Sequence, residues 1–147
     1  MKLKLLTDSA AKTFDLGVKL GKQLRPNSVL AFYGDLAAGK TTLIKGIASA
    51  LGGIQSEDVS SPTFTYLNIY QSDSYLLYHF DLYRLKEPAQ FLHMGFDEYL
   101  TAGGICCIEW SERIKAYLPS ERIDILMEHQ NDSRSITIES FYEEICF

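Results

Sequence analysis

The feature that most constrains this 147-residue chain is the glycine-rich stretch GDLAAGKT at residues 34–41. It matches the pattern G-x-x-x-x-G-K-[S/T] at every fixed position. An apolar run at 29–33 precedes it, and a segment with helical periodicity at 40–51 follows. A strand, a tight glycine loop and a helix in this order form a P-loop. The stretch therefore predicts an α/β protein that binds phosphate groups at the N-terminus of a helix.

Each part of the stretch has a physical task in binding a nucleoside triphosphate. Gly34 lets the chain turn out of the strand, and Gly39 lets the backbone approach phosphate oxygens and adopt positive φ. Lys40 supplies a positive charge to the β- and γ-phosphates, and the Thr41 hydroxyl is placed to ligate Mg²⁺. We expect ATP or ADP and Mg²⁺ as ligands, with nucleotide contacts from the loop and the start of the helix: Gly34, Asp35, Leu36, Ala37, Ala38, Gly39, Lys40, Thr41 and Thr42.

Two apolar runs end in an acid that can complete the metal site. Residues 75–80 lead to Asp81, and residues 104–108 lead to Glu109. Ligands of α/β proteins bind at the carboxyl ends of strands, so either acid fits, and the sequence does not rank them. One would ligate Mg²⁺ together with Thr41, and the other would align water or sense the γ-phosphate. The alternative for either acid is a solvated carboxylate at a strand end.

Residues next to these acids have more than one interpretation. Thr63, in the segment Ser61-Pro62-Thr63-Phe64, either senses the γ-phosphate or belongs to an ordinary turn. His79 shares a strand face with Asp81 and is either a base or, as we expect, a structural histidine. Trp110 follows Glu109 directly and is either a core residue or an anchor for a partner. The candidate catalytic residues are Asp81, Glu109, Lys40 and Thr63.

The whole pattern predicts one α/β domain over residues 1–147, a P-loop NTPase-like layered fold with a mixed sheet of about seven strands flanked by helices. A first helix, capped by Asp8 or Ser9, is expected to run to about Leu24, with Phe14, Val18 and Leu24 facing inward and with Gly17 and Gly21 allowing close packing. Antiparallel hairpins are expected over 63–80 and 122–139. Short helices are expected around Gly95 and after Ser111.

Composition argues against several classes of partner. The net charge of −5 argues against direct electrostatic binding of DNA or RNA. No apolar run approaches the roughly 20 residues that span a membrane, and the N-terminus lacks the apolar core of a signal peptide. Cys106 and Cys107 lie in an apolar run without a CxxC pattern, so they read as buried strand residues of a protein from a reducing cytoplasm.

Four motifs occur in order: GDLAAGKTT, SPTF, HFDLYRL and IEW. Together they resemble the TsaE (YjeE) family over nearly the whole chain, and the last two are not general P-loop features. The resemblance implies an ATPase subunit of the bacterial system that makes threonylcarbamoyladenosine in tRNA. Its implied partners are the TsaB and TsaD proteins, which transfer the threonylcarbamoyl group, so tRNA is engaged only indirectly through that complex.

The resemblance also implies roles for single residues. SPTF corresponds to a switch-I-like loop and HFDLYR to a switch-II-like loop, while Glu109 lies at the Mg²⁺ site and Arg134 near the nucleotide. One departure is Ala37, where the family loop usually has glycine. An alanine forced to positive φ costs about 1 kcal/mol, which would weaken nucleotide binding modestly.

The sequence leaves three functions open. A slow, partner-regulated ATPase leads, because no arginine finger or substrate lid is evident. A stand-alone small-molecule kinase and a non-hydrolysing nucleotide sensor are the alternatives. A GTPase is not expected, because no Asn-Lys-x-Asp or Thr-Lys-x-Asp run is present to read guanine.

Overall fold

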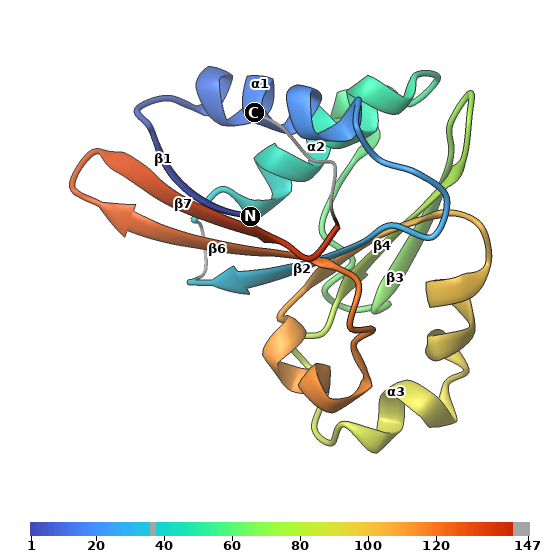
Figure 1. Cartoon of the computed structure of the whole chain (residues 1–147). Helices are drawn as coiled ribbons and strands as arrows, with labels where there is room; N and C mark the ends of the chain where they lie inside the picture. The colour runs from blue at the N-terminus through green and yellow to red at the C-terminus, as the bar shows by residue number, and fades with distance from the viewer. Residues whose placement is uncertain (36–37, 143–147) are drawn as a thin grey trace.

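The computed structural model describes residues 1–35 and 38–142, and its centre is a seven-stranded mixed sheet in the order β1-β7-β6-β2-β5-β4-β3 (Figure 1). Strand β2 pairs in parallel with β5 and β6, and β4 pairs in parallel with β5. The outer strands β1, β7 and β3 pair antiparallel with their neighbours. The expected α/β fold and mixed sheet are confirmed. The strands are β1 (Lys2–Thr7), β2 (Val29–Gly34), β3 (Leu67–Gln71), β4 (Leu76–Asp81), β5 (Ile105–Glu109), β6 (Ile123–Gln130) and β7 (Ser133–Ser140).

Helical layers cover both faces of the sheet, which explains why the central strands read as continuous apolar runs. In β2, Leu30 and Phe32 enter one hydrophobic cluster, while Val29 enters the other. This alternation follows from the period of two in a strand. Cys106 and Cys107 are buried in opposite clusters, as the apolar run around them predicted.

Helices α1 (Ala10–Gly21) and α2 (Lys40–Leu51) lie together over one face (Figure 1). Their backbones touch closely at Gly17, where there is no room for a side chain: a Cβ would collide with the carbonyl of Leu43. The prediction that Phe14 and Val18 face inward is wrong: Leu16 and Leu20 do so, because Gly17 must face α2. The helix also ends at Gly21 rather than near Leu24.

Short helices cover the opposite face, as expected around Gly95: α3 (Ala89–His93) and the 3₁₀ helix η2 (Phe96–Thr101). Phe80 of β4 packs there against Phe91, Phe96 and Tyr99. The segment after β5 is a kinked 3₁₀ helix, η3 (Ser111–Tyr117), and a further 3₁₀ turn, η1 (Ser56–Asp58), follows α2. Among the described residues, no helix has the length and apolar character that crossing a bilayer requires.

The first hairpin begins later than predicted. Residues 63–66 form a turn, and β3 starts at Leu67. The N–H of Tyr66 donates to the carbonyl of Pro62 (2.8 Å), and Tyr66 has a φ of 67°. The β-branched and aromatic residues before Leu67 favoured a strand, but this turn overrides that preference. As a result, Thr63 lies beside the end of β4 instead of in the sheet.

Candidate functional site

The candidate site lies where β2, β4 and β5 end side by side. These strands end at Gly34, Asp81 and Glu109, and the parallel register pairs Asp81 with Glu109. Both acids lie on the face covered by α1 and α2, because Leu77, four positions before Asp81, and Cys107, two positions before Glu109, enter the cluster on that face. The two carboxylates are thus neighbours at the carboxyl edge of the sheet.

The backbone around the glycine loop presents amide groups to this edge. Gly39 caps α2 with a φ of 99°, and the first helical hydrogen bond runs from the N–H of Leu43 to Gly39 (3.0 Å). The amides at the start of a helix have no intrahelical acceptor, so they are available to an anion. Gly34 has a φ of 130°, and a Cβ there would collide with the backbone of Met127 in β6. Both glycines therefore have the backbone role that the motif predicted.

Lys40 is held inside the site, with only 5% of its surface exposed. Its Nζ donates to the carbonyl of Gly34 (2.9 Å) and lies 4.3 Å from the ring centroid of Trp110. Trp110 follows β5 with a φ of 60°, and Tyr83 packs against its ring. A cation over an indole face is attracted by the ring quadrupole. Trp110 thus contributes to the site while it also packs against the second hydrophobic cluster.

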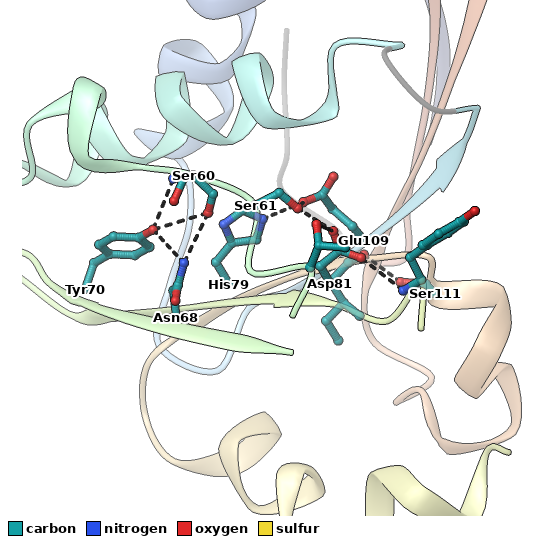
Figure 2. A network of polar contacts seen from close by, with 11 residues as sticks. Ser60, Ser61, Asn68, Tyr70, His79, Asp81, Glu109 and Ser111 are labelled. Carbon is teal, nitrogen blue, oxygen red and sulfur yellow. Dashed lines mark hydrogen bonds and ion pairs between the residues drawn. The ribbon is translucent and has the colours of Figure 1, made fainter. Parts of the chain in front are cut away.

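One serine hydroxyl bridges the two acids (Figure 2). Ser61 Oγ is within hydrogen-bond reach of Asp81 Oδ2 and of Glu109 Oε2, the latter at 3.0 Å. A hydroxyl has a single proton, so the two carboxylates share this donor. Thr63 Oγ1 also donates to Asp81 Oδ2 (3.2 Å), and the N–H of Tyr83 donates to Oδ1 (3.0 Å).

Residue Ser60 ties this segment to the first hairpin (Figure 2). Its N–H donates to the hydroxyl of Tyr70 (3.2 Å), and its carbonyl accepts from Asn68 Nδ2 (3.2 Å). The position of Ser61 over the acids is therefore set by contacts with β3.

His79 lies against the second acid. Its Nε2 is 2.7 Å from Glu109 Oε2, and the histidine is fully buried. Its Nδ1 has no hydrogen-bond partner among the residues that the structure describes.

Two cavities meet at the start of α2. The first cavity has a volume of about 350 Å³ and is lined by Gly39, Lys40, Thr41, Thr42, Ser61, Thr63, Asp81, Glu109 and Trp110. The second cavity has a volume of about 270 Å³ and is lined by Thr7, Asp8, Ser9, Ala10, Thr13, Gly39, Thr42, Asp132 and Arg134. Gly39 and Thr42 line both, so the two spaces adjoin.

The first cavity unites most of the residues singled out in the sequence, and Arg134 lines the second. Asp35 is exposed and Ala38 is buried next to Gly39, while Leu36 and Ala37 lie outside the described residues. Sequence reasoning assigned no individual role to Ser61, although the SPTF segment that carries it was singled out for Thr63. Its link to both acids depends on the turn at 62–66, and the sequence offered a turn at this segment without indicating that it would bring Ser61 to the acids.

The donor atoms around the first cavity suit a hard cation. They include the hydroxyl of Thr41 and the carboxylates of Asp81 and Glu109, and oxygen ligands are those that Mg²⁺ prefers. Within residues 1–35 and 38–142, no group of three or more His, Cys, Asp or Glu side chains is arranged to hold a metal without further ligands.

Burial raises the pKa of the Cys106 thiol to about 12, so this cysteine stays protonated.

This arrangement of strand, glycine loop, helix and strand-end acids defines a P-loop-like α/β protein, a class that handles nucleotides. The family model described as "Threonylcarbamoyl adenosine biosynthesis protein TsaE" matches residues 7–136, and the chain belongs to this family. Membership connects it with tRNA threonylcarbamoyladenosine biosynthesis, as the resemblance implied.

Individual relatives agree with this assignment. The chain is 40% identical over 126 residues to the tRNA threonylcarbamoyladenosine biosynthesis protein TsaE of Bacillus subtilis, covering 83% of this chain and 77% of the relative. It is 39% identical over 137 residues to the protein of the same name from Treponema pallidum, covering 92% and 99%. The crystal structure of Bacillus subtilis YdiB superposes with a TM-score of 0.78 at 32% identity, over 97% of this chain and 87% of that one.

Proposed function

We propose that the chain is a Mg²⁺-dependent ATP-binding and ATP-hydrolysing subunit that supports threonylcarbamoyl transfer to tRNA adenosine by a TsaB–TsaD complex. The observation that carries the proposal is the first cavity, in which the start of α2, Lys40 and Thr41 face both strand-end acids. Family membership supplies the process, and the cavity supplies the chemistry. The expected setting is the cytoplasm, where tRNA is modified.

The phosphates would bind at the start of α2. Unpaired amides and the positive end of the helix dipole favour an anion there. Lys40 is already inside the site, so little side-chain entropy remains to be lost when it meets a phosphate. Its present partners, a carbonyl and an indole ring, are neutral, so a polyphosphate would compete with them effectively.

The metal would be held by Thr41 together with Asp81 or Glu109. When bound, Mg²⁺ neutralises negative charge on the phosphates. Ser61 shares its single proton between the two acids, so a cation bound to one of them would compete with this hydroxyl for that carboxylate. Thr63 lies on the same segment and would move with it, which fits a switch loop that responds to the γ-phosphate.

The second cavity offers space for the nucleoside. It adjoins the first at Gly39 and Thr42, and it carries Arg134 on its wall. A nucleotide with its phosphates in the first cavity would extend the sugar and base toward this space. The proposal therefore includes Arg134 among the residues near the nucleotide.

Slow hydrolysis and regulation by a partner are part of the proposal. Among the described residues that line the first cavity, Lys40 is the one cation, and phosphoryl transfer without an arginine in the site is slow. The segment that carries Ser61 and Thr63 also presents Phe64, whose side chain is 79% exposed, with Arg84 over its ring. A partner that contacts Phe64 would act on the hydroxyls over the acids.

Calorimetry and turnover measurements test the proposal. The full chain should take up ADP and ATP only weakly without Mg²⁺ and more tightly at millimolar Mg²⁺, and added TsaB–TsaD should accelerate ATP hydrolysis. Absence of nucleotide uptake would overturn the proposal. Transfer of labelled phosphate to a metabolite would identify a kinase. Nucleotide-dependent partner affinity without any turnover would identify a sensor.

A further inference from the structure

His79 is a buried polar residue to which the proposed function gives no task. Leu77, His79 and Asp81 share one face of β4, and the register pairs His79 with Cys107 and Asp81 with Glu109. The imidazole therefore reaches diagonally across the two strands to Glu109, which lies two residues beyond its direct partner Cys107. The distance of 2.7 Å between Nε2 and Oε2 is that of a strong hydrogen bond.

The surroundings determine which ring nitrogen carries the proton. Nδ1 is buried and has no partner among the described residues. A buried N–H without an acceptor is more costly than a bare lone pair, which leaves Nε2 as the protonated nitrogen. His79 then donates to Glu109. Neither nitrogen offers a lone pair to a water molecule in the first cavity, so this geometry does not suit a general base.

The hydrogen bond also determines which oxygen of Glu109 remains available. In the described part of the structure, His79 and Ser61 both contact Oε2. His79 lies on a strand and Ser61 on a loop, so if cation binding releases Glu109 from the Ser61 hydroxyl, the bond from His79 continues to hold Oε2. Because Oε2 is held by His79 on β4, the orientation of the whole carboxylate, including Oε1, does not depend on the loop that carries Ser61.

We propose that His79 is a positioning residue, whose Nε2–H fixes the orientation of the Glu109 carboxylate for the hydrolysis of ATP. The inference rests on the proposed function, because it assigns Glu109 a role in the reaction. Groups that orient a metal ligand or a catalytic carboxylate typically contribute about 10–100-fold to activity when they are removed.

Variants of both residues test the inference. His79→Leu should lower kcat for ATP at least about 10-fold while the Kd for ADP changes less than about 3-fold. His79→Gln, whose amide nitrogen can replace Nε2, should restore most of the rate, whereas the shorter His79→Asn should not. In single turnovers of the Glu109→Gln protein, adding His79→Leu should have little further effect.

A packing role would give different results. Equal losses for His79→Leu in the wild-type and Glu109→Gln backgrounds would overturn the inference, as would equal activity of His79→Gln and His79→Asn. If His79→Leu fails to fold, the comparison of Gln with Asn still decides the question.

A spectroscopic measurement separates this inference from the proposed function. Nitrogen-15 NMR of the full chain should detect His79 as the Nε2–H tautomer, without any nucleotide present. An Nδ1–H tautomer would overturn the inference even in an active ATPase. The Nε2–H tautomer in a chain that binds no nucleotide would leave the hydrogen bond established but overturn the assignment, because Glu109 would then have no reaction to serve.

Discussion

At the scale of single residues, the site is held together by contacts that a ligand has to break. Lys40 is occupied by the Gly34 carbonyl and the Trp110 ring, and the two acids share the hydroxyl of Ser61. A phosphate or a cation would bring opposite charge to these ionised groups, so we expect it to bind them more strongly than the neutral carbonyl, indole ring and hydroxyl do. Substitutions at these positions therefore affect binding and turnover differently.

Replacement of Lys40 should mainly affect affinity. Lys40→Ala removes the ammonium from a nearly dry site, and losing a hydrogen bond to a charged group costs up to about 3 kcal/mol, or about 100-fold in Kd. Calorimetry with ADP and Mg²⁺ measures this change. Lys19→Ala, on the exposed side of α1, is the matched control and should bind normally. Unchanged affinity of Lys40→Ala would contradict the proposed phosphate site.

Replacement of Asp81 should mainly affect turnover. We expect Asp81→Ala to lower kcat about 100-fold while the Kd for ADP changes less than about 10-fold, because the amides of α2 still hold the phosphates. Asp81→Asn keeps an oxygen for the N–H of Tyr83 and so separates the charge from the local fold. Steady-state hydrolysis by the three proteins provides the measurement, and normal turnover of Asp81→Ala would remove this residue from the site.

The position of a site residue can be predicted from the sequence when it depends on neighbouring residues in the chain rather than on the arrangement of distant strands. Gly34, Gly39 and Lys40 act through a fixed spacing within one loop, so their positions follow from the motif. Whether Asp81 and Glu109 meet depends on the neighbouring places of β4 and β5 in the sheet, and the sequence indicated only that both end strands. The contact of His79 with Glu109 needs the strand register as well, and no sequence pattern supplies it.

At the scale of elements, the contact of α1 with α2 holds the start of α2 in place beside the sheet. Gly46 faces α1 so closely that a Cβ would collide with the carbonyl of Phe14. The two helices together cover the face that carries both acids. A change that separates them would move the start of α2 relative to those acids.

A single methyl group at this contact should be destabilising. Gly46→Ala gains helix propensity, but overpacking against a backbone carbonyl outweighs it, and we expect a loss of about 1–3 kcal/mol. Urea denaturation monitored by circular dichroism measures the difference. Ser49→Ala, on the exposed side of the same helix, is the control and should change stability little. Equal stability of both variants would mean that the helices separate without cost.

Element boundaries follow from the sequence where an end has its own chemical signal. Helix α2 begins after Gly39 and ends before Gly52 as predicted, because glycines mark both ends. The sequence predicts a start of β3 that is too early, because the residue with positive φ in the preceding turn is Tyr66 and not a glycine or asparagine, the residues that usually mark such a turn. The carbonyl of Tyr66 accepts a hydrogen bond from the N–H of Asp81 (2.9 Å), and this contact, remote in sequence, holds the turn.

At the scale of the whole molecule, burial of ionisable groups predicts the response to alkaline pH. Burial raises the pKa of Cys106 from 9.0 to about 12, and it raises that of Tyr33 from 10.0 to about 12. Above pH 9 the unfolded chain releases these protons first, so it binds fewer protons than the folded chain. The free energy of unfolding should therefore fall between pH 9 and 12.

Urea denaturation at pH 7.5, 9 and 10.5 measures this dependence. Cys106→Ala should show a smaller decline than the wild-type protein, because one of the titrating groups is gone. Cys106 lies in the apolar core, so the variant is compared by its slope with pH rather than by its absolute stability. An equal slope in both proteins would show that the thiol ionises alike in the folded and unfolded chains.

The pairing of β2 has a consequence for how the chain emerges from the ribosome. Both of its neighbours, β5 and β6, lie more than seventy residues downstream, since β2 ends at Gly34 and β5 begins at Ile105. At about 5–20 residues per second, the nascent strand waits roughly 4 to 14 s with its backbone groups unpaired. Until then the strand has no partner in its own sheet, and the first cavity, which needs Asp81 and Glu109, is completed only late in translation.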